Sequence, residues 1–357
     1  MSSFSINKHH IGGGQTYMIA ELSANHGGNL THALKVIHAM KEAGADAVKL
    51  QTYTADTLTI DCDREEFRVG KGTLWEGRTL YDLYQEAHTP WEWHAALFKL
   101  ATDLGMDCFS TPFDRTAVDF LEELNPPCYK IASFELVDLP LIEYVASKGR
   151  PIIMSTGMGS LAEISEAVDV VKAAGVPLAL LKCTSAYPSP PESMNLRTIP
   201  HLAEAFGVPT GLSDHTLGIA VPVAAVALGA CIVEKHFTLS RSDPGPDSAF
   251  SLEPHEFDAM VDGVRVAEKS LGKVNYQLTE EELASKTFRR SLFVVKDVEP
   301  GEPFTDKNVR SIRPGNGLSP KHFGRVIERR AAAKISRGTP LSEEHISQAD
   351  TQFNRKS

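Results

Sequence analysis

The sequence predicts an α/β fold: a (β/α)₈ barrel followed by a small β-rich C-terminal domain. Eight short runs rich in β-branched residues alternate with longer helical patterns through about the first 270 residues. Nearly every run ends in polar side chains, which is typical of barrel strands that open onto a site. The alternation stops near Lys273. We therefore predict a barrel over residues 1–272, a linker over 273–289 and a separate domain over 290–351.

The predicted strands cover residues 18–21, 47–51, 108–111, 129–133, 152–156, 179–183, 210–214 and 231–236. The segments between them carry apolar residues at i, i+3 and i+4 and often end in glycine, as helices do. A doubly wound sheet is the alternative fold. No glycine-rich phosphate loop follows the first strand, however, and the three glycines at 12–14 precede it, so we interpret them as a turn.

An insertion after the second strand, residues 54–93, interrupts the alternation and is rich in Trp and Tyr. Long loops after barrel strands build the mouth of the barrel, so this insertion is expected to cover a substrate. A packed surface excursion with its own aromatic core is the alternative. The C-terminal domain is too small to carry much chemistry alone and is expected to contribute contacts across a subunit interface.

Composition limits the function. Hydrophobic residues make up 42% of the chain and charged residues 23%, as in an ordinary globular protein. A net charge of −10 argues against a nucleic-acid partner. The sequence predicts no membrane span and no signal peptide, so we expect a cytoplasmic protein. The five cysteines form no CxxC pair, and we assign them structural roles.

Two histidines are the most informative residues. His215 and His236 end consecutive predicted strands, so their imidazoles are expected to leave neighbouring strands at the same end of the barrel. Side chains two residues apart in a strand share a face, which places Ser213 with the first histidine and Glu234 with the second. Two neutral imidazoles suit a divalent metal that acts as a Lewis acid on a carbonyl oxygen. Two hydrogen-bonded barrel histidines are the alternative.

Lysines and hydroxyl groups at the other strand ends indicate the ligand. Lys49 shares a face with Gln51, and Lys130 ends another strand. Ammonium groups and hydroxyls suit the oxygens of phosphate and carboxylate. With the metal, they predict a small phosphorylated acid that reacts with an aldehyde. Lys182 has a structural ion pair as its alternative. Asp247 lies in a Pro- and Gly-rich loop after the last strand and is expected to hold sugar hydroxyls; a simple turn is its alternative.

Together these motifs resemble the sialic-acid synthase family over almost the whole chain. The matching segments are Ala20-Glu21-Leu-Ser-Ala-Asn25-His26, Lys49-Leu-Gln51-Thr, Phe109-Ser-Thr111-Pro-Phe, Tyr129-Lys130-Ile-Ala-Ser133-Phe-Glu135, Ser155-Thr-Gly-Met-Gly, Cys183-Thr-Ser-Ala-Tyr187-Pro, Gly211-Leu-Ser213-Asp-His215, Glu234-Lys-His236-Phe, Gly245-Pro-Asp247 and Arg313-Pro-Gly-Asn-Gly. The last of these is similar to the family's antifreeze-like (SAF) domain.

The resemblance implies an enzyme that condenses phosphoenolpyruvate with an N-acylated amino sugar, using Mn²⁺ or Mg²⁺, and releases phosphate. It implies that His215 and His236 bind the metal, and that Glu21 and Gln51 orient water and sugar. It assigns phosphoenolpyruvate to Lys49, Thr111, Lys130, Ser133, Ser155, Thr184 and Ser213. It assigns the sugar to Glu135, Tyr187 and Asp247, and to Arg313 from the partner subunit of a domain-swapped homodimer.

Several residues depart from the N-acetylneuraminate pattern of the family. Ser185-Ala186 replaces Asn-Glu, Ser248 stands where histidine is common, and Leu50 stands where phenylalanine is usual. These variants resemble the pseudaminic acid branch, whose sugar is 2,4-diacetamido-2,4,6-trideoxy-L-altrose. N-acetylneuraminate or legionaminate synthesis, with the same chemistry on another sugar, is one alternative. An aldolase with Lys130 as Schiff-base nucleophile is the second, and a non-catalytic carbohydrate-binding protein is the third.

Overall fold

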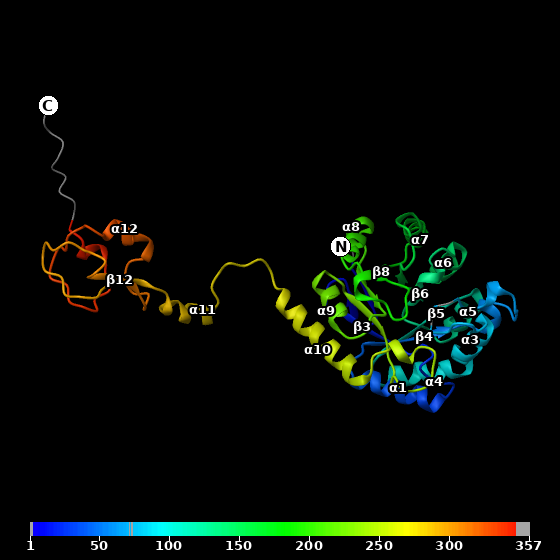
Figure 1. Ribbon diagram of the computed structural model, residues 1–357. Helices are drawn as coiled ribbons and strands as arrows, with labels where there is room; N and C mark the ends of the chain where they lie inside the picture. Colours follow the sequence, from blue (N-terminus) through cyan, green and yellow to red (C-terminus); the bar gives the residue numbers. More distant parts are fainter. Residues whose placement is uncertain (1–2, 71, 73, 348–357) are drawn as a thin grey trace. The chain divides into compact units, whose positions relative to one another are not determined.

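The computed structural model describes residues 3–70, 72 and 74–347, which form two compact units that divide after Gly272 (Figure 1). The first unit contains the predicted barrel, and the second contains the predicted C-terminal domain. Residues 348–351 of that predicted domain lie outside the described residues. The predicted limits of the linker and of the C-terminal domain stay predictions.

The first unit is a parallel barrel, as predicted. Its sheet has the order β5-β4-β3-β10-β9-β8-β7-β6, and the end strands β5 and β6 lie beside each other, which nearly closes the barrel. The strands are β3 (Tyr17–Glu21), β4 (Ala47–Thr52), β5 (Asp107–Pro112), β6 (Tyr129–Ile131), β7 (Ile152–Ser155), β8 (Leu178–Cys183), β9 (Thr210–Asp214) and β10 (Ile232–His236). The prediction for β6 was too long, because Ser133 begins a 3₁₀ turn, Ser133–Glu135.

Helices surround the barrel and pack their apolar faces on the strands (Figure 1). They are α1 (Leu30–Glu42), α4 (Trp91–Asp103), α5 (Arg115–Glu123), α6 (Leu139–Ala146), α7 (Leu161–Ala173), α8 (Thr198–Phe206), α9 (Ala220–Ala227) and α10 (Pro254–Leu271). Local sequence sets their starts: Asn29 caps α1, Asp114 caps α5, and a Ser160–Glu163 capping box begins α7. Each cap satisfies backbone N–H groups that the first turn leaves unpaired.

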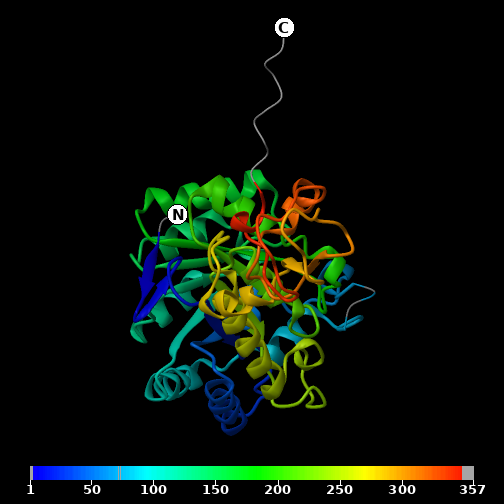
Figure 2. The same ribbon diagram turned by 90° about the vertical axis from the view of Figure 1, so that its left-hand side faces the viewer.

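Alternation along the strands divides the barrel interior into two levels. Toward the strand N-termini, inward residues such as Ile19, Phe109 and Leu181 form an apolar cluster. An antiparallel hairpin, β1 (Phe4–Ile6) and β2 (His9–Ile11), adds its buried isoleucines to this cluster and closes that end; Figure 2 shows it in dark blue. Toward the C-termini the inward residues are polar. Ligands therefore reach the interior from the C-terminal end.

The insertion is built of short elements, α2 (Ala55–Leu58), a 3₁₀ turn (Glu65–Phe67) and α3 (Leu80–Ala87). Trp91 Nε1 donates a hydrogen bond to the carbonyl of Tyr53, 3.1 Å away, so the two ends of the insertion are tied together. Tyr53 packs against Tyr84 and Phe113, with ring centroids 5.8 and 5.1 Å apart. Tyr84 of the insertion thus packs on Tyr53, an aromatic residue outside it, and whether the insertion covers a substrate stays a prediction.

The second unit contains α11 (Glu280–Ser285), the antiparallel pair β11 (Ser291–Val294) and β12 (Val309–Ile312), and α12 (Phe323–Val326). Its own core includes Leu292, Phe304 and Leu341. It is rich in short strands, isolated bridges and turns, as the sequence predicted.

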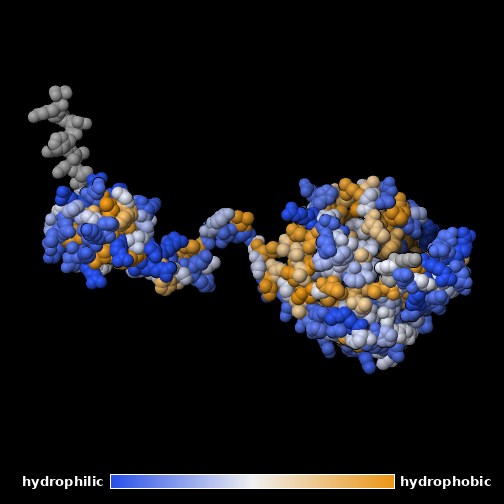
Figure 3. Space-filling view, viewed as in Figure 1, coloured by the Kyte–Doolittle hydropathy of each residue, from blue (hydrophilic) through white to orange (hydrophobic). Residues whose placement is uncertain are grey.

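The surface has mixed character. On the visible face of the barrel unit, hydrophilic and hydrophobic areas are interspersed (Figure 3). Within the described ranges, no helix combines the length and the apolar character that a membrane span needs. The five cysteines are free thiols, and three of them are buried.

Candidate active site

A cavity of about 510 Å³ lies at the C-terminal ends of the strands. It collects most of the predicted site residues, which come from seven different strands or the loops after them. These lining residues are Glu21, Lys49, Gln51, Lys130, Ser133, Glu135, Ser155, Tyr187, Ser213, His215, His236 and Asp247. The alternation of strand side chains explains this result, because the predicted pairs two residues apart all face inward.

Two lysines and two glutamates form the charged centre of the cavity. Lys49 Nζ lies 2.8 Å from Glu21 Oε2 and 2.8 Å from Glu234 Oε1. Lys130 Nζ lies 3.8 Å from the same Glu234 oxygen and donates to Ser155 Oγ at 2.7 Å. Since the four side chains are buried, these pairs are barely screened by solvent. Paired carboxylates therefore balance the lysines, where the sequence alone predicted a cationic pocket.

The same pairs shift the pKa values. Burial favours the neutral form of Glu21, but Lys49 and His236 outweigh it and lower the pKa of Glu21 to about 2. Burial disfavours the charged form of Lys49, yet Glu21 and Glu234 raise its pKa. Burial lowers the pKa of Lys130, which the more distant Glu234 offsets only in part. Lys49 and Glu21 are thus both charged near neutral pH.

The two histidines lie beside this centre, as predicted: His215 directly follows β9, and His236 ends the paired strand β10. Their ring centroids are 5.3 Å apart. His215 Nδ1 lies 3.0 Å from the carbonyl of Thr184, which favours the tautomer that leaves Nε2 as an acceptor. His236 Nε2 lies 3.5 Å from Glu21 Oε2, and its buried Nδ1 has no hydrogen-bond partner among the described residues.

This donor set fits a weakly held divalent cation. An orphaned ring nitrogen and an imidazole fixed by a carbonyl are typical of metal ligands. Burial lowers the pKa of His236, which keeps that ring neutral. Burial also opposes protonation of His215, but Cys183 and the Thr184 carbonyl raise its pKa, so a proton competes with a cation there. Among the residues that the structure describes, no cluster of three or more His, Cys, Asp or Glu side chains is arranged to hold a metal.

The outer part of the cavity contains the predicted sugar ligands. Asp247 accepts a hydrogen bond from Ser23 Oγ, and its Oδ2 lies 4.0 Å from His236 Nδ1. The Tyr187 ring packs on His215 with centroids 4.4 Å apart. Glu135 Oε2 is buried without a partner in the described part of the chain, and burial raises the pKa of Glu135 to about 7. Near pH 7 this carboxyl both donates and accepts hydrogen bonds.

Three predicted ligands are placed elsewhere. Thr111 is buried on β5 next to the cavity lining, and its Oγ1 has no hydrogen-bond partner within the described residues. Thr184 Oγ1 interacts with Lys182 Nζ at 3.2 Å and with the Ser193 carbonyl, so its visible contribution is the carbonyl that fixes His215. Arg313 is an exposed residue of the second unit. The ligand roles of all three stay predictions.

Some lining residues had no assigned role in the sequence. Glu234 lies two residues before His236 on the same strand, so the sequence predicted that it faces the barrel interior. The sequence did not show that Glu234 bridges two lysines. Ser23, which follows β3 and does not line the cavity, supports the site from behind through hydrogen bonds with Asp247 and Gln51. The remaining lining is apolar and comes largely from the insertion. Its richness in Trp and Tyr was the only available signal.

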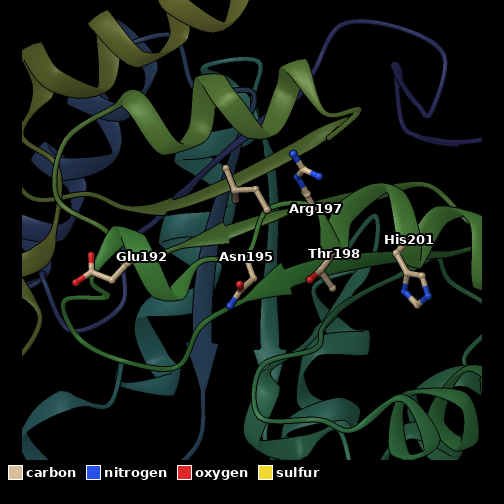
Figure 4. Close-up of a pocket in the computed structure, with 6 residues that line it drawn as sticks. Glu192, Asn195, Arg197, Thr198 and His201 are labelled. Carbon is tan, nitrogen blue, oxygen red and sulfur yellow. The ribbon is translucent and has the colours of Figure 1, made fainter.

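A second cavity, of about 540 Å³, lies where the loop after β8 enters α8 (Figure 4). It is lined by Glu192, Asn195, Leu196, Arg197, Thr198 and His201, most of them exposed. None of the predicted site residues lines it. We assign the chemistry to the barrel cavity despite its slightly smaller volume, because the buried charged groups converge there.

The fold and the site define the class. The NeuB family model matches residues 36–276 and the SAF domain model matches residues 289–347, so the chain belongs to the NeuB family and carries a SAF domain. It is 47% identical over 330 residues to a pseudaminic acid synthase from Campylobacter jejuni, covering 92% of this chain and 96% of the relative.

Two other relatives place the chain within the family. An N,N'-diacetyllegionaminic acid synthase from Legionella pneumophila is 39% identical, covering 92% of this chain and 94% of the relative. The crystal structure of an N-acetylneuraminic acid synthetase from Leptospira borgpetersenii aligns with a TM-score of 0.71 at 31% identity, covering 80% of this chain and 95% of that one.

Proposed function

We propose that the chain is a pseudaminic acid synthase, which condenses phosphoenolpyruvate with 2,4-diacetamido-2,4,6-trideoxy-L-altrose to give pseudaminic acid and phosphate. The observation that carries the proposal is the meeting of His215 and His236 with the Lys49 and Lys130 centre in one cavity. The high identity to pseudaminic acid synthases supports the choice of sugar.

The buried centre suits phosphoenolpyruvate. Lys49 and Lys130 supply charged donors, and Ser133, Ser155 and Ser213 supply hydroxyls at strand ends around them. Glu21 and Glu234 hold the lysines in place before the ligand arrives, which reduces reorganisation during the reaction. Phosphate and carboxylate would thus be bound next to the histidines.

The reaction joins C3 of phosphoenolpyruvate to the aldehyde carbon of the open-chain sugar. Water adds to C2, the bond between C2 and the bridging phosphate oxygen breaks, and phosphate leaves. His215 and His236 would hold Mn²⁺ or Mg²⁺, which when bound supplies Lewis-acid polarisation of the aldehyde. Glu21, fixed by Gln51 Nε2 at 2.7 Å, is placed to orient water or the sugar. Asp247, Tyr187 and Glu135 would orient the sugar from the outer part.

The decisive experiment is a substrate panel. The purified chain is mixed with phosphoenolpyruvate, Mn²⁺ and either the diacetamido altrose, the precursor of legionaminic acid or N-acetylmannosamine. Released phosphate and product mass are measured. We expect phosphate and a nine-carbon keto acid with the diacetamido altrose. Preference for another sugar would support the legionaminate or N-acetylneuraminate alternative. If none of the three sugars led to phosphate release, a carbohydrate-binding protein would be favoured.

A Schiff-base aldolase is the second candidate, because burial lowers the pKa of Lys130 as a nucleophilic lysine requires. Borohydride in the presence of pyruvate traps an imine if one forms. The synthase proposal expects no trapped adduct and expects EDTA to abolish activity.

We also propose a domain-swapped homodimer in the cytoplasm, in which Arg313 of one copy contacts the sugar bound by the other. Exposed apolar side chains on the segments after β6, β7 and β9, including the start of α7, support a covering partner. They are Phe134, Val137, Met158, Leu161 and Leu217, between 54% and 63% exposed. Burying such residues removes apolar surface from water.

A further inference from the structure

The cavity has two unlike walls. One is the charged centre at the strand ends. The other is apolar and aromatic, and the insertion supplies most of it: Leu58, Val69, Trp75, Leu80, Leu83 and Tyr84, with Tyr53 and Phe113 at its edges. We call this second set the insertion wall. Nothing in the condensation chemistry itself requires it.

The insertion wall is built into the fold rather than laid loosely over the mouth. Tyr53 is 3% exposed and Leu83 is 7% exposed, so the base of the wall is packed. Thr79 caps α3, the helix that carries Leu80 and Tyr84. Side chains held this way present a fixed apolar surface to the cavity.

Trp75 connects the wall to the reacting end. Its Nε1 donates to the carbonyl of Pro246 at 3.0 Å, directly before Asp247. Its ring lies 5.9 Å from that of Tyr187, which in turn packs on His215. A sugar whose aldehyde lay near the histidines would therefore extend along Tyr187 toward Trp75.

We propose that the insertion wall binds the apolar substituents of the sugar, the acetamido methyls and the 6-deoxy methyl, and that Trp75 and Tyr84 determine this specificity. The inference rests on the proposed function and names the residues that select its sugar. The ring of Tyr84 would pack on methyl groups, and its hydroxyl would hydrogen-bond to an acetamido group of the sugar. A fully hydroxylated sugar would have to lose water from its hydroxyls against the same wall, which disfavours it.

The test compares two sugars in steady-state kinetics with wild type, Trp75→Ala and Tyr84→Ala. For each variant, KM for the diacetamido altrose should rise about 10-fold while KM for phosphoenolpyruvate stays within about 2-fold. The kcat/KM preference for this sugar over N-acetylmannosamine should fall by a similar factor. Trp75→Phe keeps a ring but loses the bond to Pro246, so an intermediate effect is expected. Leu74→Ala and Gln85→Ala, at exposed neighbouring positions outside the cavity, should match wild type.

Equal losses for both substrates, or an unchanged preference between sugars, would overturn the assignment of the wall. Calorimetric binding of each sugar without phosphoenolpyruvate separates this result from a failure of the proposed reaction. If wild type binds the diacetamido sugar without turnover and Trp75→Ala binds it more weakly, the role of the insertion wall is supported and the proposed reaction is contradicted. If wild type binds neither sugar, both proposals fall.

Discussion

Lys49 shows what burial does to a single site residue. Its ammonium contacts two carboxylates at 2.8 Å, so a ligand phosphate meets a lysine that is already fixed and already neutralised. Phosphoenolpyruvate must therefore compete with these carboxylates for Lys49 through directed hydrogen bonds, because the neutralised lysine exerts little long-range electrostatic attraction. A chain with a net charge of −10 gains little from long-range steering of an anion.

Replacing His236 by alanine should separate chemistry from folding. The side chain lies at a strand end, and its Nδ1 has no hydrogen-bond partner in the described part of the chain, so alanine removes no hydrogen bond of that nitrogen and costs mainly the ring contact with Phe250. We expect kcat to fall by about 100-fold or more, with a melting temperature within a few degrees of wild type. Steady-state kinetics and thermal unfolding measure the two effects. A variant that unfolds instead would assign the histidine to the core.

Glu135 should make stability depend on pH. Its folded pKa of about 7 exceeds the ordinary glutamate value of 4.5, so the fold favours the protonated form. This contribution is complete below pH 4.5 and is lost as pH rises through about 7. Glu135→Gln, which mimics the neutral acid, should match wild type at low pH and exceed it by about 2–3 kcal/mol near pH 8. Urea unfolding across pH measures this, and parallel curves would contradict it.

The sequence predicted inward-facing residues well because strand parity is a local property. It did not predict which charges pair, since Glu234 meets Lys49 and Lys130 only through contacts across the barrel. It likewise could not show that the carbonyl of Thr184, rather than its hydroxyl, fixes His215.

At the scale of elements, β9 and β10 share a buried ion pair behind the histidines. Lys235 contacts the carboxylate of Asp214, and both side chains are fully buried. Each residue directly precedes a proposed metal ligand. Asp214→Asn leaves an uncompensated buried ammonium and should lower the free energy of unfolding by about 3–5 kcal/mol. Urea unfolding measures this loss. The double variant with Lys235→Met should recover much of the stability; no recovery would show that the pair does not account for it.

Strand boundaries were predicted to within one residue, because β-branched runs and the turn residues that end them are local signals. The exception is β6, where the chain turns at Ser133 and Glu135 into a 3₁₀ turn that brings both to the cavity. The insertion had no periodic pattern from which its short helices or its apolar wall could be predicted.

At the scale of the whole molecule, the regular alternation of strands and helices was enough to predict the barrel.

A domain-swapped dimer makes each site from two chains, which an experiment with mixed variants can test. His236→Ala and Arg313→Ala are expected to be weak alone. Unfolded together and refolded as mixed dimers, they should regain about a quarter of wild-type activity, because half the dimers then carry one intact site. Activity no higher than the average of the two variants would refute the swap.

The hairpin at the base of the barrel has a kinetic consequence. Ile6 and Ile11 close that end of the barrel, so substrates and products would pass through the C-terminal opening alone. The charged centre lies deeper in the cavity than the proposed sugar position. A sugar that arrived early would block the way, so phosphoenolpyruvate must enter first and the nine-carbon acid must depart before a new cycle starts. An unreactive sugar analogue that enters the free enzyme should accordingly raise the KM for phosphoenolpyruvate.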